Sequence, residues 1–382
     1  MVVSATTDLP VAVGRMLRQA RTALGLTLSQ VGESMGLATS TISDIESQKR
    51  RVSAVELYKF AKLYHRPLTF FFDQDESSAC FSVLLRAASA ASVPRETIIG
   101  FQDLCKDYRD LMQLVGAPEM PGPPDYSSAS LTTLEQAEDL AVAERSSMGL
   151  DSQPIKDICD LLEKKRGVKI FHLPEESQEF SGALACDKDL GACLLINSHH
   201  PQRRRTFTVA HEYGHCIAHR NQLAHAHIDT DTGFVTRRPH ERFANAFAAA
   251  FLMPRRAMNE MLSQFVSKQT TAPTAEVVFH LATYFGTSFE ATGWRLVSLR
   301  KLSLSRWQGI MTQRVTTSPI AILLGYCDRE DPPDMLPRHY KYLAYEAYKT
   351  KLVSFEKLAE LLRRNYYELR DELSGESKEG DA

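Results

Sequence analysis

Apolar residues near the N-terminus recur at the spacing of short helices and are separated by glycines. One helical face holds the apolar side chains Met16, Leu17, Ala20 and Leu24. Gly25 ends this helix, Thr27 can cap a second helix, and Gly36 breaks the second helix before a third opens near Ala38. The pattern predicts five short helices over residues 11–73, with a tight glycine turn between the second and the third.

The next part of the chain combines helical patterns with a proline-rich segment. Residues 96–116 carry apolar side chains at helical spacing and predict one long helix, whereas residues 117–130 have the composition of a linker. Amphipathic segments at 131–150 and 155–167 predict two further helices. Residues 74–153 as a whole carry no readable chemistry, and we interpret them as a helical connecting region.

Beyond Val168 the pattern changes to short apolar runs that are separated by glycine or charged turns. These runs, at residues 167–176, 181–189 and 191–197, predict three strands of a small sheet. An extended peptide can add to the edge of such a sheet as a further strand, and residues 191–197 are our candidate for that edge strand.

The C-terminal third of the chain is again helical in pattern. Residues 274–296 contain a glycine between two apolar helical segments, which imitates a second helix-turn-helix, but we interpret them as core packing. Residues 337–373 predict further helices, and the polar residues 374–382 predict a disordered tail. We therefore expect an α+β fold that is mostly α.

Composition is typical of an ordinary soluble protein. The 382 residues are 43% hydrophobic and 24% charged, with a formal net charge of −2, which argues against bulk electrostatic capture of nucleic acid or membrane. We interpret the local basic run Arg203–Arg205 as solvated surface, with substrate or DNA contact as the alternative. The seven cysteines form no CxxC pair, and no apolar run approaches the roughly 18 residues of a membrane helix. We expect a cytoplasmic protein with reduced thiols and no membrane contact.

The strongest chemical signal is the HExxH sequence formed by His211, Glu212 and His215. In a helix, positions i and i+4 lie about 40° apart around the axis, so both imidazoles project from one face. Two neighbouring imidazoles can hold one zinc ion, and Glu212 can reach a water on that ion as a general base. Gly214 leaves room for close packing. The motif indicates a metallopeptidase with one Zn²⁺ per chain, the alternative being two core histidines on an ordinary helix.

A catalytic zinc needs a third protein ligand while one position stays open for water. Glu241 opens the next helical segment and is the best candidate. Asn245 lies one turn further on, where its side chain can support the carboxylate or a ligand histidine. Imidazole is also a good zinc ligand, so four histidines compete with Glu241: His219, His225, His227 and His240.

The sequence AHEYGH at 210–215, followed by ERFANAFAAAFLMP at 241–254, resembles the ImmA/IrrE-type zinc metallopeptidase family. The lead-in RRRTFTVAHE and the helical segments downstream are similar to that family as well. The resemblance implies a general-base role for one residue and zinc binding for three: Glu212, and His211, His215 and Glu241. One departure is Phe243, where many relatives carry a second acidic residue.

Residues 25–72 resemble the XRE (Cro/C1-type) helix-turn-helix family, including the pattern Ile42, Ile45 and Glu46. In such folds the second helix of the pair lies in the major groove, while flanking residues contact phosphates. The expected base-facing residues are Thr39, Ser40, Ser43 and Asp44, with Thr41 beside them, and the expected phosphate contacts are Gln30, Lys49, Arg50 and Arg51.

The N-terminal module is only weakly basic. Residues 1–75 contain nine Lys and Arg against seven Asp and Glu, so a single copy should bind DNA weakly. We therefore expect a homodimer on a double-stranded operator. A module that serves only dimerisation or protein contact is the alternative.

These segments predict five regions in chain order. They are a helix-turn-helix domain at 11–73, the connecting region at 74–153, a zincin-like metallopeptidase domain with a small sheet at 154–300, a helical region at 301–373 and the tail at 374–382. We expect a DNA-binding zinc metallo-endopeptidase that regulates transcription by cleaving a repressor or another regulatory protein in response to stress, mobile-element or phage signals. The alternatives are a regulator whose peptidase-like domain senses a ligand or partner without proteolysis, and an antitoxin-like partner-binding protein.

Overall fold

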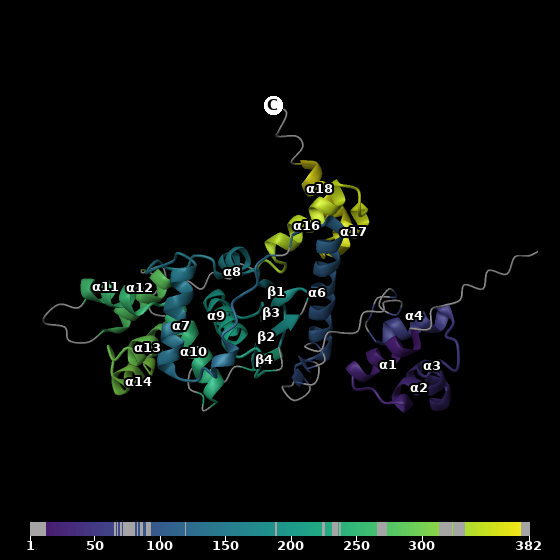
Figure 1. The fold of residues 1–382 in the computed structure, drawn as a ribbon, viewed down its shortest axis with the longest axis horizontal. Helices are drawn as coiled ribbons and strands as arrows, with labels where there is room; N and C mark the ends of the chain where they lie inside the picture. Colours follow the sequence, from purple (N-terminus) through teal and green to yellow (C-terminus); the bar gives the residue numbers. More distant parts are fainter. Residues whose placement is uncertain are drawn as a thin grey trace, which may run out of the picture. The chain divides into compact units, whose positions relative to one another are not determined.

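A computed structural model describes most of the chain. The described residues are 13–64, 93–118, 120–187, 189–223, 226–230, 238–265, 273–312 and 333–375, together with a few isolated positions. The chain divides into two compact units, with the boundary between Ile99 and Gly100. Figure 1 labels the elements of both units. Among the described residues, no helix combines the length and apolar character that a membrane crossing requires.

The first unit contains four of the five predicted helices: α1 (Val13–Ala23), α2 (Leu28–Met35), α3 (Thr39–Glu46) and α4 (Ala54–Leu63). Thr27 caps α2 through its side chain, and Gly36 ends α2 with a left-handed φ of 66°, a conformation that glycine adopts without steric cost. The predicted glycine turn between α2 and α3 is therefore present. The predicted fifth helix falls largely outside the described residues.

A buried ion pair joins the helices of the first unit. The Arg21 guanidinium donates to both carboxylate oxygens of Glu46, over 2.6 and 2.8 Å, and also to the Leu26 carbonyl at 2.8 Å. Because this fork binds the end of α3 and the loop that follows α1, it fixes α3 against the body of the unit. Ile42 and Ile45 are buried on the inner face of α3, which leaves its opposite face exposed.

The second unit is a small sheet surrounded by helices. The helix α6 begins at the unit boundary and belongs to the second unit from Gly100 on. The helices are α6 (Arg95–Val115), η2 (Ser127–Ala129), α7 (Leu134–Ser147), α8 (Ile158–Arg166), α9 (Gln202–Ala218), α10 (Pro239–Leu252), α11 (Arg255–Phe265), α12 (Ala275–Phe285), α13 (Phe289–Ser298), α14 (Leu304–Thr312), α16 (Arg338–Lys349), α17 (Phe355–Leu361) and α18 (Tyr366–Gly375). The described part of the chain is thus α+β and mostly α, and the predicted helices at 96–116, 131–150 and 337–373 are confirmed.

Within the described residues the sheet has four strands, in the order β1-β3-β2-β4. The three predicted strands are β1 (Lys169–Leu173), β2 (Phe180–Asp187) and β3 (Gly191–Asn197), and the unpredicted β4 (Ala226–Thr230) pairs antiparallel with β2. The prediction of 191–197 as an edge strand is wrong, because β3 pairs with β1 on one side and β2 on the other. Its run of buried apolar residues is typical of an interior strand.

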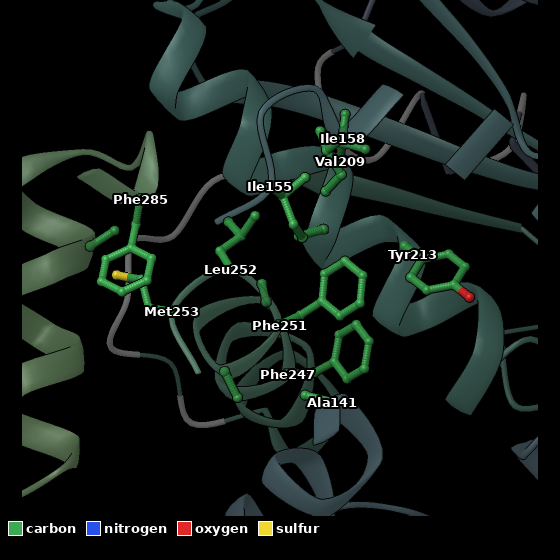
Figure 2. Packing of buried hydrophobic residues seen from close by; sticks show 14 of the residues in the cluster. Ala141, Ile155, Ile158, Val209, Tyr213, Phe247, Phe251, Leu252, Met253 and Phe285 are labelled. Carbon is green, nitrogen blue, oxygen red and sulfur yellow. The ribbon is translucent and has the colours of Figure 1, made fainter. Parts of the chain in front are cut away.

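The helix α9 lies between the sheet and the helical layer of α7 and α10. Tyr213 on α9 faces Phe247 and Phe251 on α10, with ring centroids 6.1 and 6.0 Å away (Figure 2). The Tyr213 hydroxyl donates to Glu144 on α7 over 2.6 Å. Residues 274–296 form α12 and α13, whose apolar side chains belong to this same core, so their interpretation as packing is confirmed.

The proline-rich residues 117–130 pack against the end of α9 and are not a loose linker. The Tyr126 N–H donates to the Ile217 carbonyl over 2.8 Å, and Arg220 donates to the Pro124 carbonyl over 2.6 Å. Gln222 donates to the Ser127 carbonyl over 2.5 Å. Proline has no N–H of its own but keeps a carbonyl, so the segment serves as an acceptor surface for α9.

The basic run before the HExxH segment is structural, so its interpretation as solvated surface is wrong. Arg203 donates to the Ala282 carbonyl over 2.9 Å, and Arg205 donates to the His200 carbonyl over 2.5 Å. Arg204 donates to the Gln178 carbonyl over 3.2 Å. These bonds attach the first turn of α9 to three different parts of the second unit.

We expect Gly214→Ala to destabilise the second unit. A Cβ at position 214 would lie 2.8 Å from Cδ1 of Phe247, whose ring stacks on Phe251 and has little room to move. Overpacking of this kind costs about 1–3 kcal/mol. Gly309→Ala is the matched control, because nothing lies within 4 Å of its added Cβ and alanine favours a helix. Urea unfolding of both variants tests this, and equal midpoints would contradict it.

Candidate metal centre

Three donor atoms from α9 and α10 meet at one buried point. Nε2 of His211 lies 3.1 Å from Nε2 of His215, and Oε2 of Glu241 lies 3.3 and 3.4 Å from these nitrogens. Helical spacing brings the two histidines to one face of α9, and Glu241 comes from the first turn of α10. A tetrahedral zinc ion with bonds of about 2.0–2.1 Å separates its ligand atoms by about 3.3–3.4 Å. The three donors therefore have the spacing of zinc ligands.

The rear nitrogen of His211 is held by Asn245, one turn beyond Glu241 on α10. Nδ1 of His211 lies 2.9 Å from Oδ1 of Asn245. An amide oxygen only accepts hydrogen bonds, so Nδ1 of His211 carries the proton and donates it. In the neutral ring, the lone pair is then on Nε2, the atom that faces His215 and Glu241.

A second hydrogen-bond chain sets the tautomer of His215. Nε2 of His219 lies 2.7 Å from the Leu131 carbonyl, and Nδ1 of His219 lies 3.1 Å from Nδ1 of His215. A carbonyl accepts only, so His219 donates from Nε2 and accepts at Nδ1, and His215 must donate from Nδ1. The Nε2 lone pair of His215 is thereby directed at the same point as that of His211.

His211 and Glu241 carry opposite charges in the metal-free centre. Burial opposes a charge on His211, but Glu241 and the nearby Asp229 raise the pKa of His211 to about 9. Burial would raise the pKa of Glu241, but its contacts with His211 and His215 hold that pKa well below its usual range. Burial lowers the pKa of His215 well below its usual value. At neutral pH, His211 of the metal-free centre is thus protonated beside the Glu241 carboxylate.

Glu212 lies beside the three donors and is fully buried. Within the described residues, neither of its carboxylate oxygens has a hydrogen-bond partner. Burial, followed by repulsion from Asp229, holds the pKa of Glu212 well above its usual value. A buried carboxylate with both oxygens available can take a proton from a water in the same space.

The other candidate histidines lie at different depths around this point. His227 on β4 reaches it, with Nε2 3.5 Å from Oε1 of Glu241. His219 lies behind His215, and the His240 ring lies 4.5 Å from the His219 ring, so neither belongs to the group of converging donors. His225 lies outside the described residues. Phe243 is buried with its ring 4.9 Å from that of His219, so it packs behind the centre.

The donor set suits a zinc ion. Two imidazole nitrogens and one carboxylate oxygen are ligands that zinc prefers, and the rear bonds to Asn245 and His219 fix the two rings as the outer partners of ligand histidines do. Without a cation or a proton between them, the two Nε2 lone pairs would repel each other at 3.1 Å. His211, His215 and Glu241 could therefore hold one Zn²⁺ per chain, with Glu212 next to it.

The expected DNA-contacting residues lie on the outer face of the first unit. Thr39, Ser40, Ser43, Lys49, Arg50 and Arg51 are exposed, and Thr41 and Asp44 are partly exposed. Gln30 is exposed as well, but its side-chain oxygen accepts from Thr27 at the start of α2, over 2.8 Å from the backbone nitrogen. Arg50 pairs with Glu56 over 2.8 Å, which reduces the charge that it offers to a phosphate.

Comparison with family models finds a match within each unit. Residues 17–71 match the helix-turn-helix model, and residues 163–297 match the model described as the IrrE N-terminal-like domain. The chain is thus a regulator-type protein in which a helix-turn-helix DNA-binding domain accompanies a peptidase-like domain. That second domain is of the IrrE/ImmA type, as the resemblance of the sequence implied. No curated protein matches the chain.

The sequence did not reveal three parts of the site: the Leu131 carbonyl, the orienting role of His219 and the position of His227. The Leu131 carbonyl has no signal in a sequence, since every residue carries one. His219 was considered only as a competing ligand, although its i+4 spacing from His215 was a sign that the two rings could meet on the helix. His227 was named only as one of four competing ligands, and the strand that carries it was not predicted.

We expect zinc binding to release about one proton at neutral pH. His211 must lose its Nε2 proton to bind the ion, and its pKa is about 9. The affinity for zinc should therefore fall about tenfold for each pH unit below 9 and level off above it. Competition with a chromophoric chelator between pH 7 and 10, together with calorimetry in buffers of different protonation enthalpy, measures both effects. An affinity that is constant between pH 7 and 8.5 would show that His211 is not the group that holds the proton.

We expect Asn245→Ala and His219→Phe each to weaken zinc binding about 10- to 100-fold without abolishing it, because each removes the acceptor behind one ligand histidine. His240→Phe is the matched control, since His240 lies close by without bonding to a ligand nitrogen. Zinc dissociation constants at pH 7.5 provide the measurement. Unchanged affinity in both variants would rule out this orienting role.

Proposed function

We propose that the protein is a DNA-binding regulator whose peptidase-like domain is an active zinc endopeptidase. The observation that carries the proposal is the convergence of His211, His215 and Glu241 at tetrahedral spacing, with both imidazole lone pairs directed inward by rear hydrogen bonds. A pair of ordinary core histidines would not need this arrangement. Glu212, buried beside them, is the proposed general base.

The proposed reaction is hydrolysis of a peptide bond. A bound zinc ion would supply Lewis acidity for the scissile carbonyl and would lower the pKa of a water at its open position. Glu212 takes the proton of the attacking water and delivers it to the leaving amine. The buried surroundings of Glu212 favour its protonated form, so it can hold this proton between the two steps.

The proposed substrate is a repressor or another regulatory protein. The support is the fusion itself, since a helix-turn-helix domain brings the peptidase to the DNA sites where such proteins bind. In this proposal Thr39, Ser40 and Ser43 face base edges, and Lys49 and Arg51 face phosphates. A homodimer on a double-stranded operator would double the phosphate contacts that one weakly basic module makes. Cleavage would follow stress, mobile-element or phage signals.

A cavity in the second unit favours a second candidate function, which is ligand sensing without proteolysis. It has a volume of about 260 Å³ and lies between α8, β1, the first half of α9 and the chain before α16. Its wall includes His172, Arg205 and Arg338 beside the apolar Ile170 and Val209. Because the cavity touches the helix that carries the HExxH motif, a small molecule bound there would act on that helix.

Replacement of Glu212 by glutamine tests proteolysis. The change is nearly isosteric, so zinc and DNA binding should be retained while cleavage is lost by a factor of at least about 100. New protein N-termini are compared in native cells that carry the wild-type protein or the variant, before and after DNA damage or phage challenge. Termini that appear only with the wild type identify the substrate.

The control for this experiment is operator binding by both proteins, measured by footprinting near the gene of the protein itself. Equal footprints show that the two domains work independently and that Glu212→Gln is folded. Identical N-termini in both strains, with zinc bound at one per chain, would remove the protease proposal and leave the sensing function.

A further inference from the structure

His227 is a buried imidazole whose forward nitrogen has no hydrogen-bond partner among the described residues. Its side chain is 12% exposed, and its ring centroid lies 4.4 Å from that of His215. Such a nitrogen costs free energy unless something binds to it. A metal ion or a hydrogen-bond donor next to Nε2 of His227 would remove this cost.

That space is the metal centre. The donor atoms of His211, His215, His227 and Glu241 all lie within 4.8 Å of one another. Glu241 directs Oε2 to the two α9 histidines and Oε1 to His227, at 3.5 Å. The first three donors are spaced like one triangular face of a tetrahedron, and a donor atom of His227 lies within 4.8 Å of each of them.

We infer that His227 is a fourth protein ligand that closes the zinc site and keeps the peptidase latent. With three protein ligands, zinc has a position for the water that attacks the substrate, whereas with four it has the closed sphere of a structural site. Imidazole is a ligand that zinc prefers, so Nε2 of His227 is a suitable donor for the position that the other three ligands leave open. The fourth-ligand assignment rests on the proposed zinc site alone, whereas the latency also rests on the proposed proteolysis.

The strand that carries His227 can leave the sheet at low cost. The strand β4 has five residues and, among the described strands, pairs with β2 alone, at the end of the strand order, with a register irregularity between Phe180 and Gly182. His227 stands opposite Leu184 in this pairing. An edge strand this short loses few hydrogen bonds when it separates. Its departure would open the metal and expose the edge of β2 together.

The full chain loaded with Co²⁺ in place of zinc tests this inference through its visible absorption spectrum. Co²⁺ reports the number and symmetry of its ligands, and acetohydroxamate changes the spectrum only where it can reach the metal. We expect the wild-type spectrum to be that of a four-coordinate ion and to resist millimolar acetohydroxamate. In His227→Ala and His227→Phe we expect a different spectrum, which shifts when acetohydroxamate is added. We also expect the affinity for zinc to fall about 100-fold or more, because the loss of a direct ligand costs at least as much as the loss of an outer partner.

Two comparisons make the test specific. His227→Phe keeps a ring of similar size on β4, so agreement between it and His227→Ala separates the loss of a ligand from the loss of packing. His240→Ala removes a neighbouring histidine that is not one of the converging donors and should match the wild type. A wild-type site that takes acetohydroxamate as readily as His227→Phe overturns the fourth-ligand assignment and leaves the proposed peptidase intact. Failure of the wild type to bind one metal ion per chain overturns both.

Discussion

The candidate metal centre of the second unit depends on a close contact between two imidazole rings. Nε2 of His211 and Nε2 of His215 lie 3.1 Å apart, and both side chains are buried. That contact is repulsive unless a cation or a proton lies between the nitrogens, so each ring must be fixed from behind before the pair can be useful. Asn245 fixes one ring, and His219 with the Leu131 carbonyl fixes the other. The close packing of α9 on α10, made possible by Gly214 against Phe247, is what brings these partners to the correct depth.

Much of the fold was predictable because it depends on local periodicity. Helical spacing identified α6, α7 and the glycine turn between α2 and α3, and apolar runs identified the first three strands. The position of β3 inside the sheet was not predicted, because pairing is decided by residues far away in the chain. The strand β4 was missed for a related reason: the sequence around His227 and Asp229 is polar, and it is a strand only because the edge of β2 is available to it.

Composition was a poor guide wherever the backbone supplied the partner. The run at Arg203–Arg205 and the prolines at 117–130 suggested exposed charge and a loose linker. However, Arg203 and Arg205 donate to main-chain carbonyls, and the Pro124 carbonyl accepts a hydrogen bond from Arg220. Composition reveals none of these bonds, because every residue carries a main-chain carbonyl. The same limit applies to the candidate site, where the sequence indicated His211, Glu212, His215 and Glu241 but gave no sign of Leu131. The candidate ligands and the candidate base could be predicted from the sequence, whereas the groups other than Asn245 that orient the ligands could not.

The hydrogen bond from His219 to the Leu131 carbonyl has a consequence for what counts as the working part of the molecule. The region that matches the IrrE-type model begins at residue 163, yet Leu131 and the Tyr213 partner Glu144 precede it. A fragment cut at the edge of that region would retain the whole HExxH motif with one histidine free to turn its ring. The smallest module that keeps the candidate metal centre intact therefore starts before α7, in the segment that composition alone would assign to a spacer.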